Sequence, residues 1–309
     1  MIEALQMLPF LHDLEQIRKP VFTFIAKTVT LLGQEVLPVL IICIIFWCID
    51  KKAGYKFIFV FFSSGVICQT MKISFRIDRP WILDPTLSPV KGALKSATGY
   101  SFPSGHTQAA TSLFGSLIFY LRKPVYKIAS AIIILSVAFS RLYLGVHTLL
   151  DVSVSMLITF LLVVLFFTLL KNISNNADSY IRLSLITATV CIFILFYASY
   201  LYYSGYIEYD LIKDGFKTVG SGLGFSIGFF IENKYVNFNV KCKNIRLQII
   251  KLVLGISSAL IFKSVLKLIF KENIYSDTLR YMFLVIYLVA LYPLIFTKLF
   301  NYREAVHEK

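Results

Sequence analysis

Three short polar segments interrupt a chain that is otherwise almost continuously apolar, and each carries residue types that bind or transfer phosphate groups. The segments read KISFRIDRP at 72–80, PSGH at 103–106 and SRLYLGVHTLLD at 140–151. Lysine and arginine bind phosphate oxygens through charge-assisted hydrogen bonds, and histidine can serve as a nucleophile or as a general acid. The spacing within each segment decides whether these side chains can meet.

The first segment supplies two cations, Lys72 and Arg79. Seven residues along a continuous helix would bring both side chains to nearly the same face. Pro80 disfavours helical backbone at Arg79, so we expect the chain to turn into a loop at that point. In either case the two cations can converge at the membrane surface. The alternative is a pair of basic residues whose charged ends reach the lipid head groups independently.

The second segment resembles the start of a helix. Pro103 suits a first helical turn, and Ser104 and Gly105 place small side chains beside the free N–H groups of the helix that follows. Such a helix terminus binds anions. His106 would project from the first turn into the same space. The alternative is a simple capping turn with a histidine at the membrane interface.

The third segment places His147 and Asp151 four residues apart, so on a helix they share a face and the carboxylate can hold one imidazole nitrogen. The other nitrogen is then left as a fixed lone pair. Arg141 and Asp151 are also ionisable residues within apolar sequence, where such groups are costly and usually functional. The alternative is an internal Arg141–Asp151 pair that locks two helices together.

Together the three segments match a phosphate group that must be held and transferred, with three cations, a helix N-terminus and two histidines. A histidine with a carboxylate behind it is the natural nucleophile, and the second histidine can protonate the leaving oxygen. A phosphohistidine intermediate is expected. Because the sequence has no carboxylate cluster and no HExxH, GxxxxGK[ST] or GxSxG motif, we expect neither a metal nor a cofactor.

In order and spacing, the segments closely resemble the signature KxxxxxxRP, PSGH and SRxxxxxHxxxD of the type 2 phosphatidic acid phosphatase (PAP2) superfamily. The resemblance covers roughly residues 35–170. It implies that the phosphate is bound by the side chains and backbone of a set of five residues: Lys72, Arg79, Ser104, Gly105 and Arg141. It also implies that His147 attacks phosphorus, that Asp151 orients His147, and that His106 is the general acid.

The composition predicts the elements that position these residues. The 309-residue chain is 57% hydrophobic and 16% charged, with a mean hydropathy of +0.74, so we expect an integral membrane protein. We predict an all-α, polytopic bundle of about eight or nine spanning helices and an N-terminal interfacial helix, since no segment alternates like a barrel strand. The candidate spans lie near 35–50, 56–74, 105–121, 125–144, 148–170, 181–203, 215–231, 247–270 and 280–299.

The charge distribution predicts orientation and excludes other classes. The formal net charge is +14, but Lys and Arg flank apolar segments instead of forming one cluster, so nucleic-acid binding is not expected. The Lys and Arg residues of the loops at 51–56, 122–127, 171–182 and 234–251 mark the cytoplasmic side, which places the active site outward, in a membrane that we expect to be the bacterial cytoplasmic one. The five cysteines include no CxxC pair, which argues against both a disulfide framework and a zinc site.

We divide the chain into an interfacial amphipathic helix at 1–33, a PAP2-like catalytic core at 34–171 and a transmembrane extension of unknown role at 172–309. Within the extension, Gly220, Gly224 and Gly228 recur every four residues on one helix. This small-residue pattern permits close packing of helices in membranes. It predicts either packing within the chain or a homodimer.

The leading hypothesis is an integral membrane phosphatase that acts on a lipid phosphate or diphosphate at the extracytoplasmic face without a metal. Phosphatidic acid, phosphatidylglycerophosphate and a polyprenyl diphosphate are all acceptable substrates, and the bilayer itself delivers them. The first alternative is a lipid phosphotransferase that uses the same intermediate. The second is a transporter of lipid or phosphate, which would tolerate His147→Asn.

Overall fold

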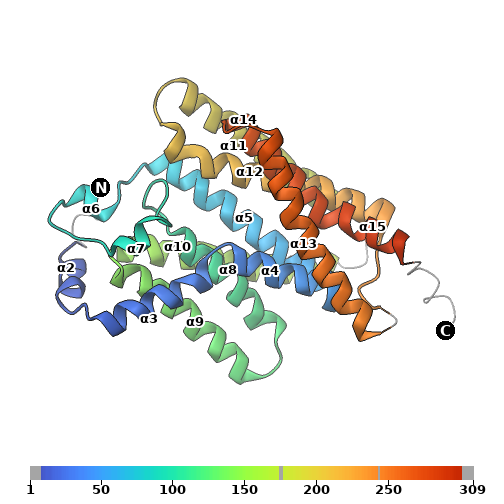
Figure 1. The fold of residues 1–309 in the computed structure, drawn as a ribbon, viewed down its shortest axis with the longest axis horizontal. Helices are drawn as coiled ribbons and strands as arrows, with labels where there is room; N and C mark the ends of the chain where they lie inside the picture. Colours follow the sequence, from blue (N-terminus) through green and yellow to red (C-terminus); the bar gives the residue numbers. More distant parts are fainter. Residues whose placement is uncertain (1–7, 174–176, 243, 301–309) are drawn as a thin grey trace. The chain divides into compact units, whose positions relative to one another are not determined.

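The computed structural model describes residues 8–173, 177–242 and 244–300, and within these ranges the chain forms helices and turns but no strand (Figure 1). The helices up to the third polar segment are α2 (Leu8–Gln16), α3 (Pro20–Thr30), η1 (Leu31–Gly33), α4 (Val36–Ile44), η2 (Ile45–Ile49), α5 (Lys51–Phe75), α6 (Pro80–Leu83), α7 (Lys91–Leu94), α8 (Gly105–Tyr120) and α9 (Pro124–Tyr143). Those that follow are α10 (Leu149–Ile173), α11 (Ala177–Tyr203), α12 (Tyr209–Ile231), η3 (Glu232–Val236), α13 (Ile245–Ile269), α14 (Ile274–Ile286), η4 (Tyr287–Leu291) and α15 (Tyr292–Leu299). The predicted all-α class is confirmed.

Six helical segments of the described chain are long and apolar enough to cross a membrane, and a seventh arises if Pro20–Gly33 and Val36–Ile49 form one span bent by 47°. The predicted count of eight or nine is therefore not confirmed. One predicted span, 105–121, corresponds to α8, which has only 16 residues. The protein is nevertheless an integral membrane protein, with apolar helices throughout its described length.

The N-terminal region is not a single interfacial helix in the described residues. It consists of α2, α3 and the 3₁₀ turn η1, and the first seven residues lie outside the described part. Leu8, Leu11 and Leu14 are buried on one side of α2, where they pack with Leu87, Ala138, Leu142 and Val152 in one hydrophobic cluster. This packing fastens α2 to the end of α9 and the start of α10, next to the third polar segment.

The chain forms two compact units. Unit 1 comprises the residues up to Val39, Phe59–Thr168 and Asp210–Asp214, whereas unit 2 comprises Leu40–Ile58, Leu169–Tyr209 and the residues from Gly215 onward. Within unit 1, α8 packs along α9, and α3 packs on another part of α9 (Figure 1). All three polar segments belong to unit 1. The division at residues 33 and 171 stays a prediction.

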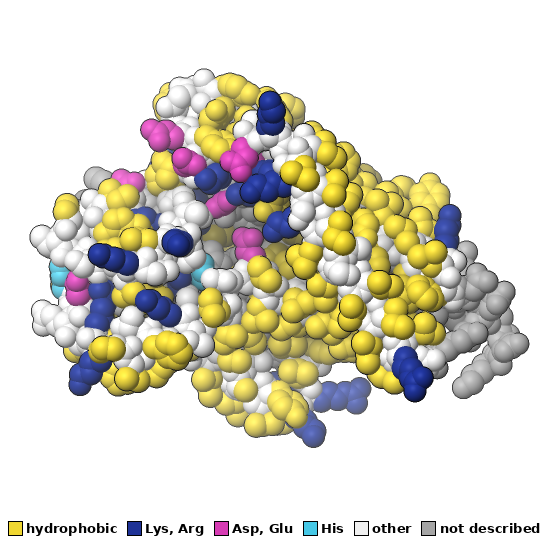
Figure 2. All heavy atoms as spheres, in the orientation of Figure 1, with side chains coloured by type: hydrophobic (Ala, Val, Ile, Leu, Met, Phe, Trp, Pro, Cys, Tyr) yellow, Lys and Arg dark blue, Asp and Glu magenta, His cyan; other side chains and the backbone are white. Residues whose placement is uncertain are grey.

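Apolar side chains dominate the surface. Figure 2 shows hydrophobic side chains over much of the face drawn, interrupted by Lys, Arg, Asp and Glu side chains. Phe193 and Phe196 of α11 are each 70% exposed, and Leu268 of α13 is 85% exposed. Large side chains exposed to this extent are stable in lipid and costly in water. The surface therefore agrees with helices that face a bilayer.

The glycine stripe of α12 packs against α14 within unit 2. A Cβ atom on Gly220 would lie 2.2 Å from the carbonyl oxygen of Thr278, and one on Gly224 would lie 2.3 Å from that of Met282. At Gly228 the approach is less tight, and a Cβ atom would lie 3.1 Å from Val289 and 3.3 Å from Ile286. The predicted close packing therefore occurs within one chain. The predicted homodimer through these glycines finds no support, because α14 lies against the face that a second copy would need.

Candidate active site

A tight turn between α9 and α10 places the third polar segment. The N–H of Gly145 donates to the carbonyl of Leu142 (2.9 Å), and the N–H of Val146 donates to that of Arg141 (3.2 Å). These two bonds form a Schellman motif, which requires a left-handed residue after the helix. Gly145 supplies it, with φ of +71°. The turn ends α9 just after Arg141 and brings His147 back beside it.

His147 and Asp151 form the pair that their spacing predicts. The imidazole Nδ1 of His147 lies 3.2 Å from Oδ2 of Asp151, and both side chains are buried. The same Oδ2 atom accepts the backbone N–H of Thr148 (2.8 Å) and the hydroxyl of Ser101 (2.6 Å). Three donors therefore fix the carboxylate, and the carboxylate in turn fixes the ring.

The other imidazole nitrogen faces an arginine. Nη1 of Arg79 lies 3.0 Å from Nε2 of His147. Because a guanidinium has only donors, Nε2 must carry the lone pair and Nδ1 the proton. Burial, together with the nearby charges of Arg79 and Arg141, holds the pKa of His147 well below its usual value. His147 is thus a neutral imidazole with its lone pair directed into the site.

The first polar segment is not helical over its whole length, because helix α5 ends before Arg79. Helix α5 ends at Phe75, Arg76 adopts left-handed backbone with φ of +51°, and Arg79 precedes Pro80 in extended conformation. Nε and Nη2 of Arg79 donate to the carbonyls of Gly99 (3.1 Å) and Thr98 (2.6 Å). The predicted turn at Pro80 therefore occurs.

Lys72, one turn before the end of α5, is 5% exposed. Its ammonium donates to the carbonyls of Tyr100 (2.5 Å) and Ser101 (3.3 Å). Four successive carbonyls, from Thr98 to Ser101, thus hold the two cations of the first segment. The segment 98–101 is the backbone support of the predicted phosphate site.

The second polar segment begins α8. Ser104 is the N-cap, and its hydroxyl accepts the backbone N–H of Thr107 (3.4 Å). No atom beyond the local backbone lies within 4 Å of the position that a Cβ on Gly105 would take. Open space therefore borders the free N–H groups of this helix terminus, where an anion binds well. Nε2 of His106 is buried without a hydrogen-bond partner.

Arg141 is completely buried. Its Nη1 donates to the hydroxyl of Thr30 in α3 (2.8 Å), whereas Nε and Nη2 are buried without hydrogen-bond partners. The predicted alternative, an Arg141–Asp151 lock, does not form, because Asp151 accepts its bonds from Ser101, Thr148 and His147. Unsatisfied guanidinium donors in a protein interior are costly. They indicate a site built for an anion.

The eight predicted site residues lie in the same compact unit. The charges of Arg141, Arg79 and Lys72 all act on His106, so the histidine of the second segment and the cations of the other two converge. Ser104 differs from the expectation in one respect: its hydroxyl is engaged as the cap of α8, where it also accepts the hydroxyl of Thr107 (3.0 Å).

Sequence patterns missed three supporting contacts. Thr30 holds Arg141 from 111 residues away, and Ser101 holds Asp151 from 50 residues away. Gly33 approaches α8 so closely that a Cβ would lie 2.6 Å from the carbonyl oxygen of His106. Ser101 could have been noticed because it stands just before the PSGH segment, but Thr30 and Gly33 carry no local signal.

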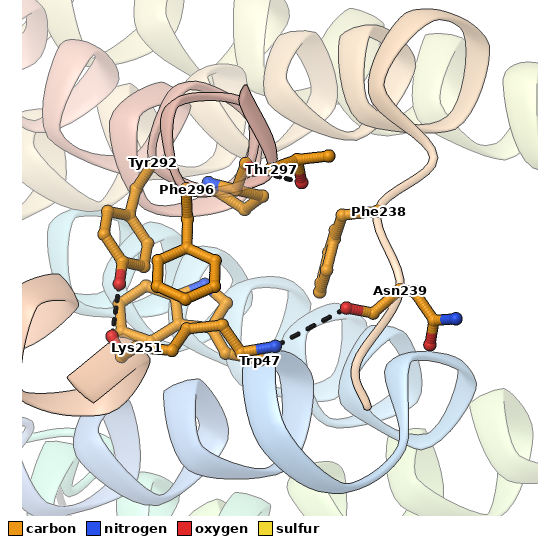
Figure 3. A pocket seen from close by; sticks show the side chains of 8 residues that line it. Trp47, Phe238, Asn239, Lys251, Tyr292, Phe296 and Thr297 are labelled. Atoms are coloured by element: carbon orange, nitrogen blue, oxygen red, sulfur yellow. Dashed lines mark hydrogen bonds between the residues drawn. The ribbon is translucent and has the colours of Figure 1, made fainter. Parts of the chain in front are cut away.

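A separate small pocket in unit 2, lined by residues that include Trp47, Phe238 and Lys251, lacks this chemistry (Figure 3). The ammonium of Lys251 donates to the carbonyl of Val240 (2.8 Å) and lies 5.6 Å from the ring centroid of Phe296. The Tyr292 hydroxyl donates to the Lys251 carbonyl. These contacts fasten the basic loop after α12, which agrees with a structural role. Among the described residues, no three His, Cys, Asp or Glu side chains are grouped to hold a metal ion.

Comparisons with known proteins identify the family of the chain. Residues 53–175 match the model of the PAP2 superfamily, and residues 216–304 match the model described as PAP2 superfamily phosphatase, transmembrane extension. The first match contains all three polar segments. The second covers most of the C-terminal helices to which the sequence patterns assigned no role.

Curated relatives of the chain are phosphatases by name. Human sphingosine-1-phosphate phosphatase 2 is 28% identical over 212 residues, which is 65% of this chain and 50% of that protein. Rat sphingosine-1-phosphate phosphatase 1 is 25% identical over 157 residues, 49% of this chain and 36% of that protein. The chain thus spans about half, or less, of the length of these relatives, and no solved structure matches it. With its three motifs on one site and both family models aligned along its length, the chain belongs to the PAP2 superfamily.

Proposed function

We propose that the protein is an integral membrane phosphatase that hydrolyses a lipid phosphate through a phosphohistidine at His147. The observation that supports it best is the set of buried, unpartnered nitrogens, Nε2 of His106 and Nε and Nη2 of Arg141. Together with the open space beside Gly105, these atoms offer donors where a phosphate group would sit. Membership of a superfamily whose extension model names phosphatases supports the same reaction class.

The mechanism follows from the tautomer of His147. Its Nε2 lone pair attacks phosphorus, and the N–P bond forms as the bond between phosphorus and the lipid oxygen breaks. Before this attack a phosphate oxygen takes over the Nη1–H bond of Arg79 and so frees Nε2, and Asp151 stabilises the positive charge that develops on the imidazole. His106, protonated once the dianionic phosphate is bound, gives its proton to the departing lipid oxygen. Water then attacks the phosphohistidine with His106 as base, which releases phosphate and restores His147.

The names of the relatives favour one substrate over the others. Sphingosine-1-phosphate, which the human and rat proteins are named for, is the first lipid to test here, followed by phosphatidic acid, phosphatidylglycerophosphate and a polyprenyl diphosphate. We place the chemistry in residues 34–171, with 1–33 and 172–309 as flanking segments. The exposed apolar helices let substrate and product diffuse within the bilayer.

The charge of the loops indicates the side of the membrane on which the active site lies. We infer from the basic loops that the active site lies on the side of the membrane opposite to them. The curated relatives come from mammals, so they give no support to the expectation of a bacterial cytoplasmic membrane. A membrane lipid is the proposed partner, and a second copy of the chain is not.

The test is phosphate release from each lipid by detergent-purified protein in EDTA, with His147→Asn and His12→Asn measured beside the wild type. His12 contacts Asp84 (2.9 Å) outside the site, so its variant is the matched control. Release that persists in EDTA and is lost only in His147→Asn supports the proposal. Release that requires an added acceptor lipid would make the protein a phosphotransferase. Turnover retained in a folded His147→Asn protein would refute the phosphohistidine.

A further inference from the structure

A carboxylate from outside both matched regions contacts the phosphate site. The five residues Asp210–Asp214 at the start of α12 group with unit 1, although the rest of α12 groups with unit 2. Within unit 1, the hydroxyl of Thr98 donates to Oδ2 of Asp214 (2.6 Å). Asp214 lies after the matched core at 53–175 and before the matched extension at 216–304, so neither family match covers it.

A second contact reinforces the first. Gly99 has φ of +62°, and a Cβ atom on it would lie 3.2 Å from the carbonyl oxygen of Leu211. The first turn of α12 therefore packs directly on the 98–99 backbone. An irregular segment that is both bonded and packed in this way loses much of its freedom to move.

The same two residues support Arg79. The carbonyls of Thr98 and Gly99 accept from the guanidinium at 2.6 and 3.1 Å. Thr98 thus links Asp214 to Arg79, the residue that bonds His147. The Asp214 carboxylate also acts electrostatically on the ammonium of Lys72, whose bonds go to the next two carbonyls of the segment. One carboxylate therefore influences both cations of the first polar segment.

We propose that Asp214 is a positioning residue of the phosphate site. By holding segment 98–101 against Arg79 and Lys72, it raises the affinity of the site for the phosphate group. The inference rests on the proposed function because it takes its substrate, a lipid phosphate, from there. The geometry of the contact does not depend on that function. A hydrogen bond to a carboxylate is stronger than one between neutral groups, so the Asp214–Thr98 bond is an effective tether. Without it, the carbonyls that aim the two cations would shift, and phosphate would bind more weakly.

Three variants test the tether. Asp214→Ala removes the acceptor, Thr98→Val removes the donor, and Asp214→Asn keeps an acceptor while removing the charge. Asp210→Ala is the matched control, because Asp210 lies in the same turn of α12 but is exposed and pairs only locally with Lys213. The readouts are KM and kcat for the best lipid phosphate, and the affinity for orthovanadate, a phosphate analogue, by thermal shift.

We expect Asp214→Ala and Thr98→Val to raise KM and the orthovanadate Kd by roughly tenfold, with a smaller change in kcat, as for loss of one charge-assisted bond. Asp214→Asn, which keeps a neutral hydrogen bond, should recover part of the affinity, and Asp210→Ala should match the wild type. Unchanged KM and orthovanadate affinity in Asp214→Ala would overturn the inference. So would equal losses in Asp214→Ala and Asp214→Asn that merely follow a lower melting temperature.

The two proposals fail separately. If the wild type releases no phosphate from any lipid but binds orthovanadate in a manner that depends on Asp214, the proposed function fails and the positioning role stands. If the wild type hydrolyses lipid phosphates and Asp214→Ala has the same KM, the function stands and the positioning role fails.

Discussion

Arg79 donates to the one nitrogen of His147 that Asp151 does not hold, at a distance of 3.0 Å. This arrangement assigns the tautomer, because the guanidinium can only donate and Nε2 must therefore accept. It also places Arg79, the proposed phosphate-binding cation, at the proposed nucleophilic atom. In the proposed mechanism, a phosphate oxygen that takes over the Arg79 bond leaves the Nε2 lone pair directed at phosphorus.

Replacement of Asp151 by Asn should lower kcat by roughly 10³- to 10⁴-fold while the protein stays folded. The amide can present its NH₂ group to Nδ1 and so favour the wrong tautomer, an effect of about this size in catalytic triads. Steady-state kinetics in detergent, with the melting temperature measured alongside, check the prediction. A variant that keeps more than a tenth of wild-type kcat would show that Asp151 does not set the tautomer.

The rate of phosphoenzyme formation should remain high as the pH falls through the usual histidine range. The pKa of His147 is lowered by burial and by Arg79 and Arg141, so the attacking nitrogen stays unprotonated until the pH drops well below about 6.5. The same shift means that stability linked to His147 is complete above about 6.5 and is lost as the pH falls toward the lowered pKa. Rapid-quench rates against pH measure the first effect. A midpoint for His147 at or above 6.5 would contradict it, and His12→Asn should leave the profile unchanged.

Loss of the Thr30 hydroxyl should weaken phosphate binding. Thr30→Val removes the acceptor of Arg141 Nη1 (2.8 Å) and leaves a third unpartnered nitrogen on a buried guanidinium. A hydrogen bond to a charged group contributes about 1.5–3 kcal/mol, so KM should rise roughly 10- to 100-fold. Thr28→Val is the control on the same helix, since the Thr28 hydroxyl bonds only locally to the carbonyl of Phe24. Equal KM values for the two variants would show that Thr30 does not contribute to phosphate binding.

A methyl group at Gly105 should block phosphate without disturbing the fold. Gly105→Ala adds a Cβ where nothing else lies within 4 Å, but this is the space that the phosphate would occupy at the start of α8. Crowding of this kind costs roughly 1–3 kcal/mol, or about 5- to 150-fold in affinity. Gly215→Ala, at another helical glycine with no atom within 4 Å, is the matched control. Orthovanadate binding distinguishes the two, and an unaffected Gly105→Ala protein would mean that phosphate binds elsewhere.

Much of the site could be predicted from the sequence because its parts are local. The loop before Pro80 follows from proline sterics, the start of α8 from Ser104 and Gly105, and the His147–Asp151 pair from its helical spacing. The long apolar runs likewise specify a helical membrane protein. The span count was less predictable, since α8, at 16 residues, reads as a span by hydropathy but is shorter than a straight crossing needs.

By itself, the sequence predicted which residues would carry the chemistry and determined the local backbone that presents them, because caps, turns and helical spacing act over a few residues. Only the tertiary structure decided which side chains support them. Thr30, Ser101 and Asp214 come from distant positions along the chain, and no local pattern distinguishes them from other polar residues. The partner of the glycine stripe of α12 was likewise decided only by the tertiary structure. Its spacing specifies close packing, but only the folded chain shows that α14, and not a second copy, fills the groove.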